Sequence, residues 1–256
     1  MENNNNSIEF ICLGSGSTGN SYIFRKNNEC VMVECGLPFK KLTTKLLEYG
    51  ITFDSIRSVI ITHRHSDHSE SVKELVGLGI PCFVPASLWV DKTNPLVINY
   101  ADKSKVKLAS WLKCYCFSTV HDVESYGFLF LDTENKETTL FMTDTKLFEF
   151  PLYDLPINYI FIECNHIRKQ LEVIMQKALD NGKQAEVFKF KRQAAYHLSL
   201  AGCKKFLNNL KHIESVKSIF LIHLSKDCCN DALVKDEIRT VYGIPTFVCY
   251  KDGGIH

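Results

Sequence analysis

The feature that most constrains this chain is a short apolar run, Val59 to Ile61, that leads into a cluster of metal-binding residue types. The cluster contains His63, His65, Asp67 and His68, so three imidazoles and a carboxylate occur within six residues. Imidazoles this close together would repel one another if protonated, and would need partners if buried. A metal ion meets that need, because neutral imidazole and carboxylate are common metal ligands. We interpret the cluster as a metal site at the end of a buried strand, in preference to a solvated turn rich in histidine.

A tight turn at this place can aim His63 and His65 at one ion, and Asp67 and His68 at a second. A dinuclear site needs more donors than the cluster supplies. Three polar residues stand where later apolar strands reach the surface, as expected of a site built on a rigid scaffold: His121, Asp144 and His223. Each alone is equally well explained as an ordinary polar residue at a strand end. Together, and after the cluster, they favour a second set of ligands.

The composition is that of an ordinary globular protein, and its balance of charge bears on the kind of substrate. The chain has 256 residues, of which 45% are hydrophobic and 23% charged, as in an ordinary soluble globular protein. Thirty basic residues face twenty-nine acidic ones. A protein that grips a long polyanion usually shows a basic excess, so any positive surface here must be local.

The termini and cysteines bear on location. Residues 1–7 form an Asn-rich polar lead without the features of a signal peptide, and we expect this lead to be disordered. No run of eighteen apolar residues occurs, so we expect no membrane partner. The eleven cysteines lack repeated C-x-x-C pairs and indicate reduced thiols in a cytoplasmic protein. Cys114 with Cys116, or Cys228 with Cys229, could instead bind metal or be redox active.

The order of predicted elements favours an α/β fold of two packed sheets flanked by helices, in one domain covering residues 8–256. Strands are expected at 8–13, 22–25, 30–35, 59–61, 82–84, 112–120, 127–132, 139–142, 158–163, 218–223 and 246–248. Helices are expected at 37–49, 69–78, 85–89, 166–179, 194–210 and 231–242. The Gly/Ser-rich loop 14–21 leads into a strand, so it does not match a phosphate-binding loop, which leads into a helix. We expect it to make a tight turn beside the metal site.

These motifs resemble the metallo-β-lactamase superfamily, and more closely the single-domain phosphodiesterases of the YycJ (WalJ) type and their short phage-encoded relatives. The resemblance implies an αββα sandwich with its site at one edge of the two sheets. It extends from about residue 8 to about residue 248. The matching stretches are Leu13 to Ser21, Glu34 to Gly36, Thr62 to His68, Phe117 to Asp122, Thr143 to Thr145, Ile162 to Asn165, His197 to Ser199 and His223 to Ser225.

The resemblance also implies a ligand set. It assigns His63, His65 and His121 to one metal ion, Asp67, His68 and His223 to the other, and Asp144 to both. Glu34 stands where many members of the superfamily have Asp, and is expected to orient a ligand imidazole whose identity stays open. No cysteine occupies the second-site position that lactam-hydrolysing members use, and Asp144 is a hard oxygen donor. Both points favour phosphodiester chemistry with two divalent ions, zinc or manganese.

The resemblance implies a mechanism as well. The two ions are expected to clamp a phosphodiester and to lower the pKa of a shared water, which Asp67 orients. His197 is expected to protonate the leaving alkoxide, as in the tRNA-processing members, although it could simply be a polar residue at a helix start. Five further residues are candidate substrate contacts, with His166 interpreted as a residue at the surface or at the edge of the substrate: Ser225, Asn165, His166, Lys191 and Arg192.

Three hypotheses for function stay open. The leading one is hydrolysis of 3′,5′-cyclic mononucleotides, as in phage relatives that counter the Pycsar defence. The second is 5′ exonuclease activity on DNA or RNA, because the stretch from Lys183 to Lys205 combines basic residues with Phe188, Phe190 and Tyr196. That stretch is equally well a solvated face, a lid or a contact with a second subunit. The third is a non-catalytic metal-binding interaction protein.

The expected partner is therefore a nucleotide, or a nucleic acid under the second hypothesis. The relatives suggest a homodimer. The expected location is the cytoplasm, which is the host cytoplasm if the chain is phage-encoded.

Overall fold

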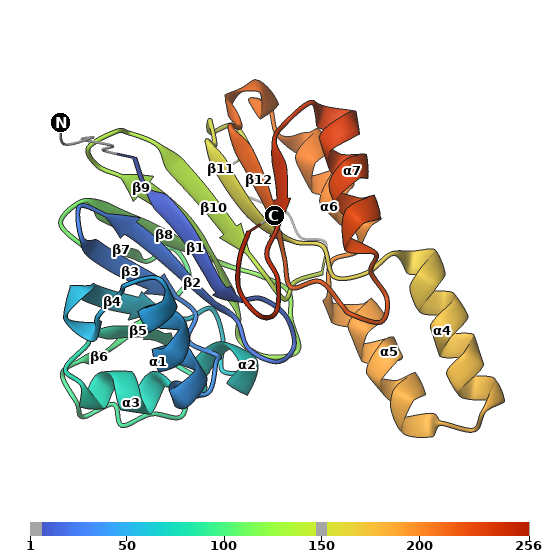
Figure 1. The fold of residues 1–256 in the computed structure, drawn as a ribbon, viewed down its shortest axis with the longest axis horizontal. Coiled ribbons are helices and arrows are strands. Elements are labelled where there is room, and N and C mark those ends of the chain that lie inside the picture. Colours follow the sequence, from blue (N-terminus) through green and yellow to red (C-terminus); the bar gives the residue numbers. More distant parts are fainter. Residues whose placement is uncertain (1–6, 147–152, 256) are drawn as a thin grey trace.

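The structure is a computed structural model that describes residues 7–146 and 153–255. Most of the predicted disordered lead, residues 1–6, lies outside these described residues. The described chain forms two sheets that pack face to face, with helices on their outer sides (Figure 1). The predicted two-sheet α/β arrangement is confirmed.

The first sheet contains six strands in sequence order. β1 and β2 are antiparallel, as are β2 and β3, whereas β3 to β6 run parallel to their neighbours. The strands are β1 (Glu9–Gly14), β2 (Ser21–Lys26), β3 (Glu29–Val33), β4 (Ile56–Ile60), β5 (Cys82–Pro85) and β6 (Val97–Tyr100).

The second sheet contains seven strands, in reverse sequence order from β13 to β7. β10 to β13 are parallel, and β8 and β10 both run antiparallel to β9. The carboxyl ends of β8, β10, β11 and β12 therefore lie at the same edge of this sheet. The strands are β7 (Lys105–Lys107), β8 (Leu112–Ser118), β9 (Tyr126–Asp132), β10 (Thr138–Met142), β11 (Tyr159–Glu163), β12 (Ser218–Ile222) and β13 (Thr246–Val248).

Both faces of the central strands are buried, which explains why these strands are continuous apolar runs. Successive side chains of a strand point to opposite faces. In β10, Phe141 joins the aromatic core between the sheets, whereas Leu140 and Met142 pack under the outer helices. Phe24 of the first sheet meets Phe130 of the second at 5.1 Å between ring centroids, edge to face.

Helices cover the outer faces of both sheets. α1 (Phe39–Glu48) and α3 (Val72–Gly77) pack on the first sheet, and α6 (Leu200–Asn209) and α7 (Asp231–Tyr242) pack on the second. The short helical elements are α2 (Ser66–Ser69) and the 3₁₀ turns η1 (Phe53–Ser55) and η2 (Ile213–Ser215).

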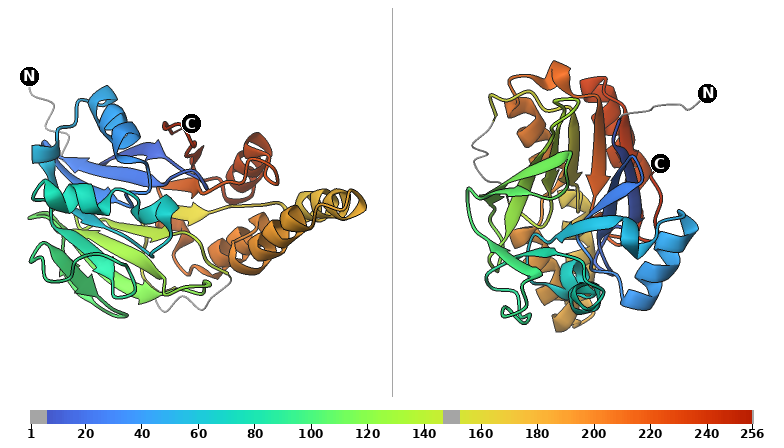
Figure 2. Two further views of the ribbon diagram at one scale, coloured as in Figure 1. Left: turned by 90° about the horizontal axis from the view of Figure 1, so that it is seen from below. Right: turned by 90° about the vertical axis from the view of Figure 1, so that its left-hand side faces the viewer.

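A helical hairpin extends beyond the two-sheet body. α4 (Arg168–Asp180) and α5 (Gln184–Tyr196) pack against each other through Leu171, Ala178, Val187 and Phe190. Figure 2 shows the pair projecting away from the sheets. We call this hairpin, residues 168–196, the arm.

Three predictions about helices are wrong in detail. The helix expected at 194–210 is split, because α5 ends at Tyr196 and α6 begins at Leu200. The helix expected at 69–78 is α2 followed by α3, interrupted near Glu70. The helix expected at 85–89 is absent, because β5 extends to Pro85 and residues 86–89 form an irregular turn.

A buried ion pair joins the two sheets at the end away from the carboxyl ends of β4, β8, β10 and β12. Lys26 Nζ at the end of β2 lies 2.8 Å from an Asp132 carboxylate oxygen at the end of β9, and both side chains are fully buried. Such a pair contributes orientation more than stability, because both charges lose their hydration. Among the described residues no helix is long and apolar enough to span a bilayer.

Candidate metal centre

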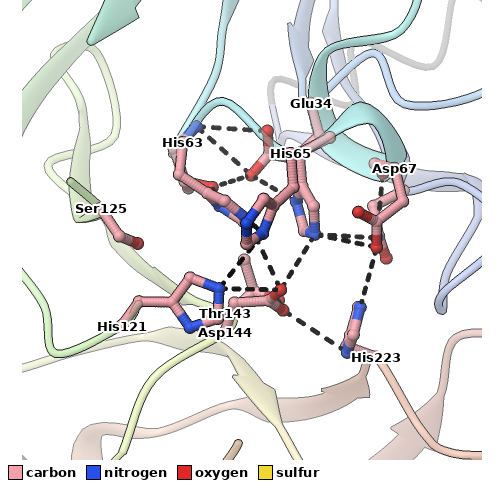
Figure 3. A network of polar contacts seen from close by, with 12 residues as sticks. Glu34, His63, His65, Asp67, His121, Ser125, Thr143, Asp144 and His223 are labelled. Atoms are coloured by element: carbon pink, nitrogen blue, oxygen red, sulfur yellow. Dashed lines mark hydrogen bonds and ion pairs between the residues drawn. The ribbon is translucent and has the colours of Figure 1, made fainter. Parts of the chain in front are cut away.

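The site lies where strands of both sheets end. β4 ends at Ile60, and the chain then turns through His63 and His65 into α2, which carries Asp67 and His68. From the second sheet, His121 follows β8, Asp144 follows β10 and His223 follows β12. Because these strand ends share one edge, residues up to 160 positions apart meet in one place (Figure 3).

Four overlapping groups of metal-binding residue types occur among the described residues, and two of them, which share one carboxylate, match the predicted ligand sets. His63, His65, His121 and Asp144 each offer a ligand atom within 4.8 Å of the others, and so do Asp67, His68, Asp144 and His223. His63 Nε2 lies 3.0 Å from His65 Nδ1, and His121 Nε2 lies 3.3 Å from the same atom. Asp144 Oδ2 is 3.6 Å from His63 Nε2 and 3.3 Å from His68 Nε2.

Burial sets the charge state of the first group. It lowers the pKa of His63, His65 and His121, and outweighs the carboxylates nearby. These imidazoles are therefore neutral, which is the form that binds metal.

In the second group, two carboxylates face two imidazoles. Burial opposes a proton on His68 and His223, but the Asp144 and Asp67 carboxylates prevail, so the pKa of His68 is raised and that of His223 is raised to about 10. Asp144, Glu34 and Glu163 are all almost fully buried. Buried carboxylates need compensating positive charge. A divalent cation in this position would supply the charge that protons supply here, so the residues fit a metal centre.

Glu34 fixes the orientation of His68. Its carboxylate lies 3.2 Å from His68 Nδ1 and accepts hydrogen bonds from the backbone N–H and the hydroxyl of Thr62. Burial raises the pKa of Glu34, and His68 partly offsets the effect. The imidazole that the sequence left unidentified is therefore that of His68, whose Nε2 is turned toward Asp67 and Asp144.

His197 lies beside the second group, held by a residue for which the sequence analysis proposed no role. Its Nδ1 is 2.7 Å from Glu163 Oε1, and its ring stacks on that of His223 at 5.3 Å. Glu163 also accepts hydrogen bonds from the backbone N–H groups of Thr145 and Leu198. Burial lowers the pKa of His197, but Glu163 and then Asp144 raise it more, so the net shift is upward.

A pocket of about 540 Å³ opens over these residues. One wall is the arm, because Ala185, Phe188, Lys189, Arg192 and Gln193 line it at helical spacing along α5. Arg192 Nε donates a hydrogen bond of 2.8 Å to Asp122, which in turn lies 3.1 Å from His121 Nε2. The arm is thus linked directly to the edge of the histidine cluster.

Of the five candidate substrate contacts, the structure places three in the lining of the pocket and two elsewhere. Asn165, Arg192 and Ser225 line the pocket, whereas Lys191 is exposed elsewhere on α5. His166 is only 3% exposed, and its Nδ1 has no hydrogen-bond partner in the part of the chain that the structure describes. The interpretation of His166 as a surface residue is therefore wrong, because the chain after β11 buries its side chain, whereas a place at the edge of the substrate stays a prediction.

Two residues were missed or left without a role by sequence reasoning. Glu163 is a charged residue at the end of an apolar strand, which is the same signal that identifies Asp144. Asn20 in the Gly/Ser-rich loop donates hydrogen bonds to the Asp67 carbonyl, at 2.8 Å from its backbone and 3.1 Å from its side chain. The loop therefore lies beside the cluster, as predicted.

Comparison with known proteins gives consistent matches. A family model described as "Anti-Pycsar protein Apyc1" matches residues 8–78. The exodeoxyribonuclease WalJ of Streptococcus pneumoniae is 24% identical over 239 residues, covering 86% of this chain and 82% of WalJ. The exodeoxyribonuclease YycJ of Bacillus anthracis is 24% identical over 146 residues, covering 54% of each chain.

Among solved structures, the protein YhfI from Bacillus subtilis matches with a TM-score of 0.72 and 17% sequence identity, over 97% of this chain and 98% of YhfI. YhfI is described as a metallo-β-lactamase fold protein. At this identity the likeness concerns the fold alone.

Proposed function

We propose that this chain, a metallo-β-lactamase-fold protein similar to WalJ and YycJ, is a dinuclear metal-dependent phosphodiesterase that acts on nucleotides. The fold predicted from the sequence, an αββα sandwich in a single domain, is confirmed. The observation that carries the proposal is the pair of His/Asp groups that share Asp144.

In the proposed ligand set, His63, His65 and His121 hold one divalent ion, and Asp67, His68 and His223 hold the other. Asp144 belongs to both groups, which supports a bridging role. Neither group contains a cysteine, and a mixture of imidazole and carboxylate suits zinc or manganese. The bound ions would supply positive charge that polarises the phosphoryl group and makes a water molecule more acidic.

The remaining chemistry belongs to the chain. Asp67 is the only carboxylate of the two groups with appreciable exposure, at 24% of its side chain, and it lines the pocket. It can accept a hydrogen bond from the attacking water and orient it as the new oxygen–phosphorus bond forms, while the proton that the water loses passes to solvent. His197, oriented by Glu163, then donates a proton to the leaving alkoxide as the old phosphorus–oxygen bond breaks.

The leading substrate is a 3′,5′-cyclic mononucleotide. The match of residues 8–78 to the anti-Pycsar family model supports it, and so does the pocket volume of about 540 Å³, which is of the size that holds a small ligand. The near balance of charge, 30 basic and 29 acidic residues, also suits a small substrate better than a long polyanion.

The alternative substrate is the 5′ end of a nucleic acid. Two relatives described as exodeoxyribonucleases support it, one of which aligns with 86% of this chain. The exposed Phe188 on the pocket wall, with Lys189 and Arg192 beside it, suits a nucleobase and phosphate in either case. We also propose a cytoplasmic location, consistent with eleven free cysteines, and keep the homodimer as a prediction from the relatives.

Hydrolysis by the purified protein loaded with Zn²⁺ or Mn²⁺ tests the proposal. One set of assays uses the four cyclic mononucleotides, and another uses 5′-labelled DNA and RNA. We expect ring opening by the wild type and by Asp54→Ala, a control that removes an exposed carboxylate just before the start of β4, at the end opposite to the site. In Asp67→Ala we expect a loss of activity of at least about a thousandfold.

Shortening of the labelled strands with intact cyclic nucleotides would replace the leading substrate by the alternative one. Activity on neither set, with metal bound, would indicate a non-catalytic metal-binding protein.

A further inference from the structure

A second pocket adjoins the candidate metal centre on the side away from the arm. It has a volume of about 540 Å³. His65 and Ser66 line both this pocket and the one described above, so the two pockets lie on either side of these two residues of the histidine cluster. In Figures 1 and 2, α2, which begins at Ser66, lies between α3 on this side and α5 on the other.

An exposed tryptophan lines the second pocket. Trp89 has 87% of its surface exposed, the largest fraction of any large hydrophobic side chain in the described ranges. Large exposed aromatic side chains at a pocket mark ligand or partner sites more often than ordinary surface does. A nucleobase can stack on such a ring whatever its sequence identity.

The turn that carries Trp89 is held in place. Leu88 N–H donates to the Pro85 carbonyl at 3.1 Å, and Ser87 N–H donates to the Glu124 carboxylate at 2.8 Å. The Lys92 ammonium donates to the Ala86 carbonyl. An aromatic surface presented on a fixed turn loses little freedom when a ligand binds.

The charges around the second pocket suit a nucleoside better than a run of phosphates. Arg64 and Lys73 line it together with Glu70 and Glu74, and none of the four forms an ion pair within the described residues. Two positive and two negative charges leave the lining neutral. A lone phosphate or the polar edge of a base can pair with Arg64, which lies between His63 and His65 in the chain.

The first pocket has an aromatic side chain of its own. Phe188 on α5 is 71% exposed and lines that pocket. One aromatic surface therefore lies on each side of the place where the ligand residues converge. A cyclic mononucleotide has one base and can use only one of them.

We infer that the Trp89 pocket is a second nucleoside subsite, so that the protein accepts a linear phosphodiester with a nucleoside on each side of the scissile phosphate. This inference rests on the proposed phosphodiesterase function. It assigns the Trp89 pocket a role in binding the second nucleoside of a linear substrate, which the pocket beside the arm alone would not explain.

Tryptophan fluorescence tests binding without any turnover. The chain has two tryptophans, and the other, Trp111, is only 3% exposed. The probe is thymidylyl-thymidine whose 5′-bridging oxygen is replaced by CH₂, which keeps the charge but cannot be cleaved. We expect this analogue to quench the emission of the metal-loaded protein, and 3′,5′-cyclic UMP to quench it little. Equal or absent quenching by the two ligands would overturn the inference, whether or not the protein is a phosphodiesterase.

Selectivity supplies the second measurement. In Trp89→Leu, we expect kcat/KM for cleavable thymidylyl-thymidine to fall roughly tenfold relative to kcat/KM for 3′,5′-cyclic UMP, the scale that stacking on one base carries. Trp89→Tyr should restore most of the ratio. Leu47→Ala, which truncates another exposed apolar side chain on α1, is the matched control and should leave the ratio unchanged. A proportional loss on both substrates in Trp89→Leu would contradict the subsite, while hydrolysis itself would still stand.

Discussion

Three of the residues at the centre adopt a backbone conformation that side chains other than glycine rarely take. The φ angles are 62° for Glu34, 47° for Asp144 and 55° for His223. Each residue comes just after a strand, so the left-handed turn directs its side chain sideways into the centre. Such conformations cost about 1–3 kcal/mol each and persist where surrounding structure holds them. Here the hydrogen bonds and burial of each side chain provide that support.

The pairing of His197 with Glu163 gives the first prediction. In Glu163→Gln, the negative charge that raises the pKa of His197 is lost, so that pKa falls. The imidazole is then less protonated near neutral pH, and the high-pH limb of the rate profile should move to lower pH. We expect kcat for cyclic nucleotides to fall by about ten- to a hundredfold.

Leaving-group dependence separates this role from a structural one. Bis(p-nitrophenyl) phosphate releases a good leaving group that needs no proton, so its hydrolysis should change little in Glu163→Gln. Glu163 also lies 3.2 Å from His223 Nδ1, so metal content is measured in parallel. An equal loss on both substrates, or a loss of metal, would mean that Glu163 acts through His223 and not through His197.

Single site residues could be predicted best from the sequence where several metal-binding residue types lie close together in the chain. His63, His65, Asp67 and His68 could be predicted because four donor residues follow one strand. The partner of Glu34 could not, because the contact joins the end of β3 to α2 and depends on the register between β3 and β4. His166 was misjudged for a similar reason, since only the fold shows that the chain buries it.

At the scale of elements, the turn that carries the cluster depends on close backbone contact with the end of β3. Cys35 N–H donates to the His68 carbonyl at 2.9 Å, and Gly36 N–H donates to the Asn20 carbonyl at 2.8 Å. A Cβ atom placed on Gly36 would lie 1.8 Å from the Asp67 carbonyl oxygen, which is backbone and cannot rotate away. Only glycine leaves room for this approach.

Gly36→Ala is therefore expected to displace Asp67 and His68 together. We expect a loss of at least one bound metal ion, a loss of activity of at least about a hundredfold, and a destabilisation on the order of 2–4 kcal/mol. Metal analysis and urea denaturation measure these effects. Gly77→Ala is the control, because a Cβ there meets no atom within 4 Å. Wild-type metal content and activity in Gly36→Ala would show that the position of Asp67 and His68 does not depend on the close approach of Gly36 to the Asp67 carbonyl.

The division between α5 and α6 shows what helical pattern alone cannot predict. A continuous helix over 194–210 suits the apolar spacing, but the chain breaks at His197. Ser199 caps α6 by accepting a hydrogen bond from Gly202 N–H at 3.2 Å, and Glu163 accepts one from Leu198 N–H at 3.0 Å. The second bond comes from a distant strand. A tertiary contact thus ends α5 where His197 can turn into the centre.

At the scale of the whole molecule, the two sheets meet at opposite ends through charged groups. At one end Lys26 of the first sheet pairs with Asp132 of the second. At the other, the cluster after β4 meets His121, Asp144 and His223 from the second sheet. The aromatic core lies between the two ends. Metal ions bound at the centre would therefore join the sheets as well as support chemistry.

The overall architecture was predictable because strand runs and helices alternate in a pattern that two layered sheets satisfy. The arm was not foreseen as a projecting hairpin. α4 and α5 pack on each other through few residues, so each shows an ordinary amphipathic pattern in the sequence. Only the fold shows that the two helices extend beyond the sheets. The sequence indicates that the stretch from Lys183 to Lys205 could contact substrate or form a lid, but not that α5 forms a wall of the pocket as one helix of a projecting hairpin.

The number of metal ions bound by each chain shows whether the centre is dinuclear. Mass spectrometry of the native protein and elemental analysis should both find two divalent ions per wild-type chain. His121→Ala and His223→Ala should each retain about one, because each removes a ligand from a different group, and Asp144→Ala should lose both. One ion or none in the wild type, or two ions in Asp144→Ala, would contradict the dinuclear centre from which the proposed function follows.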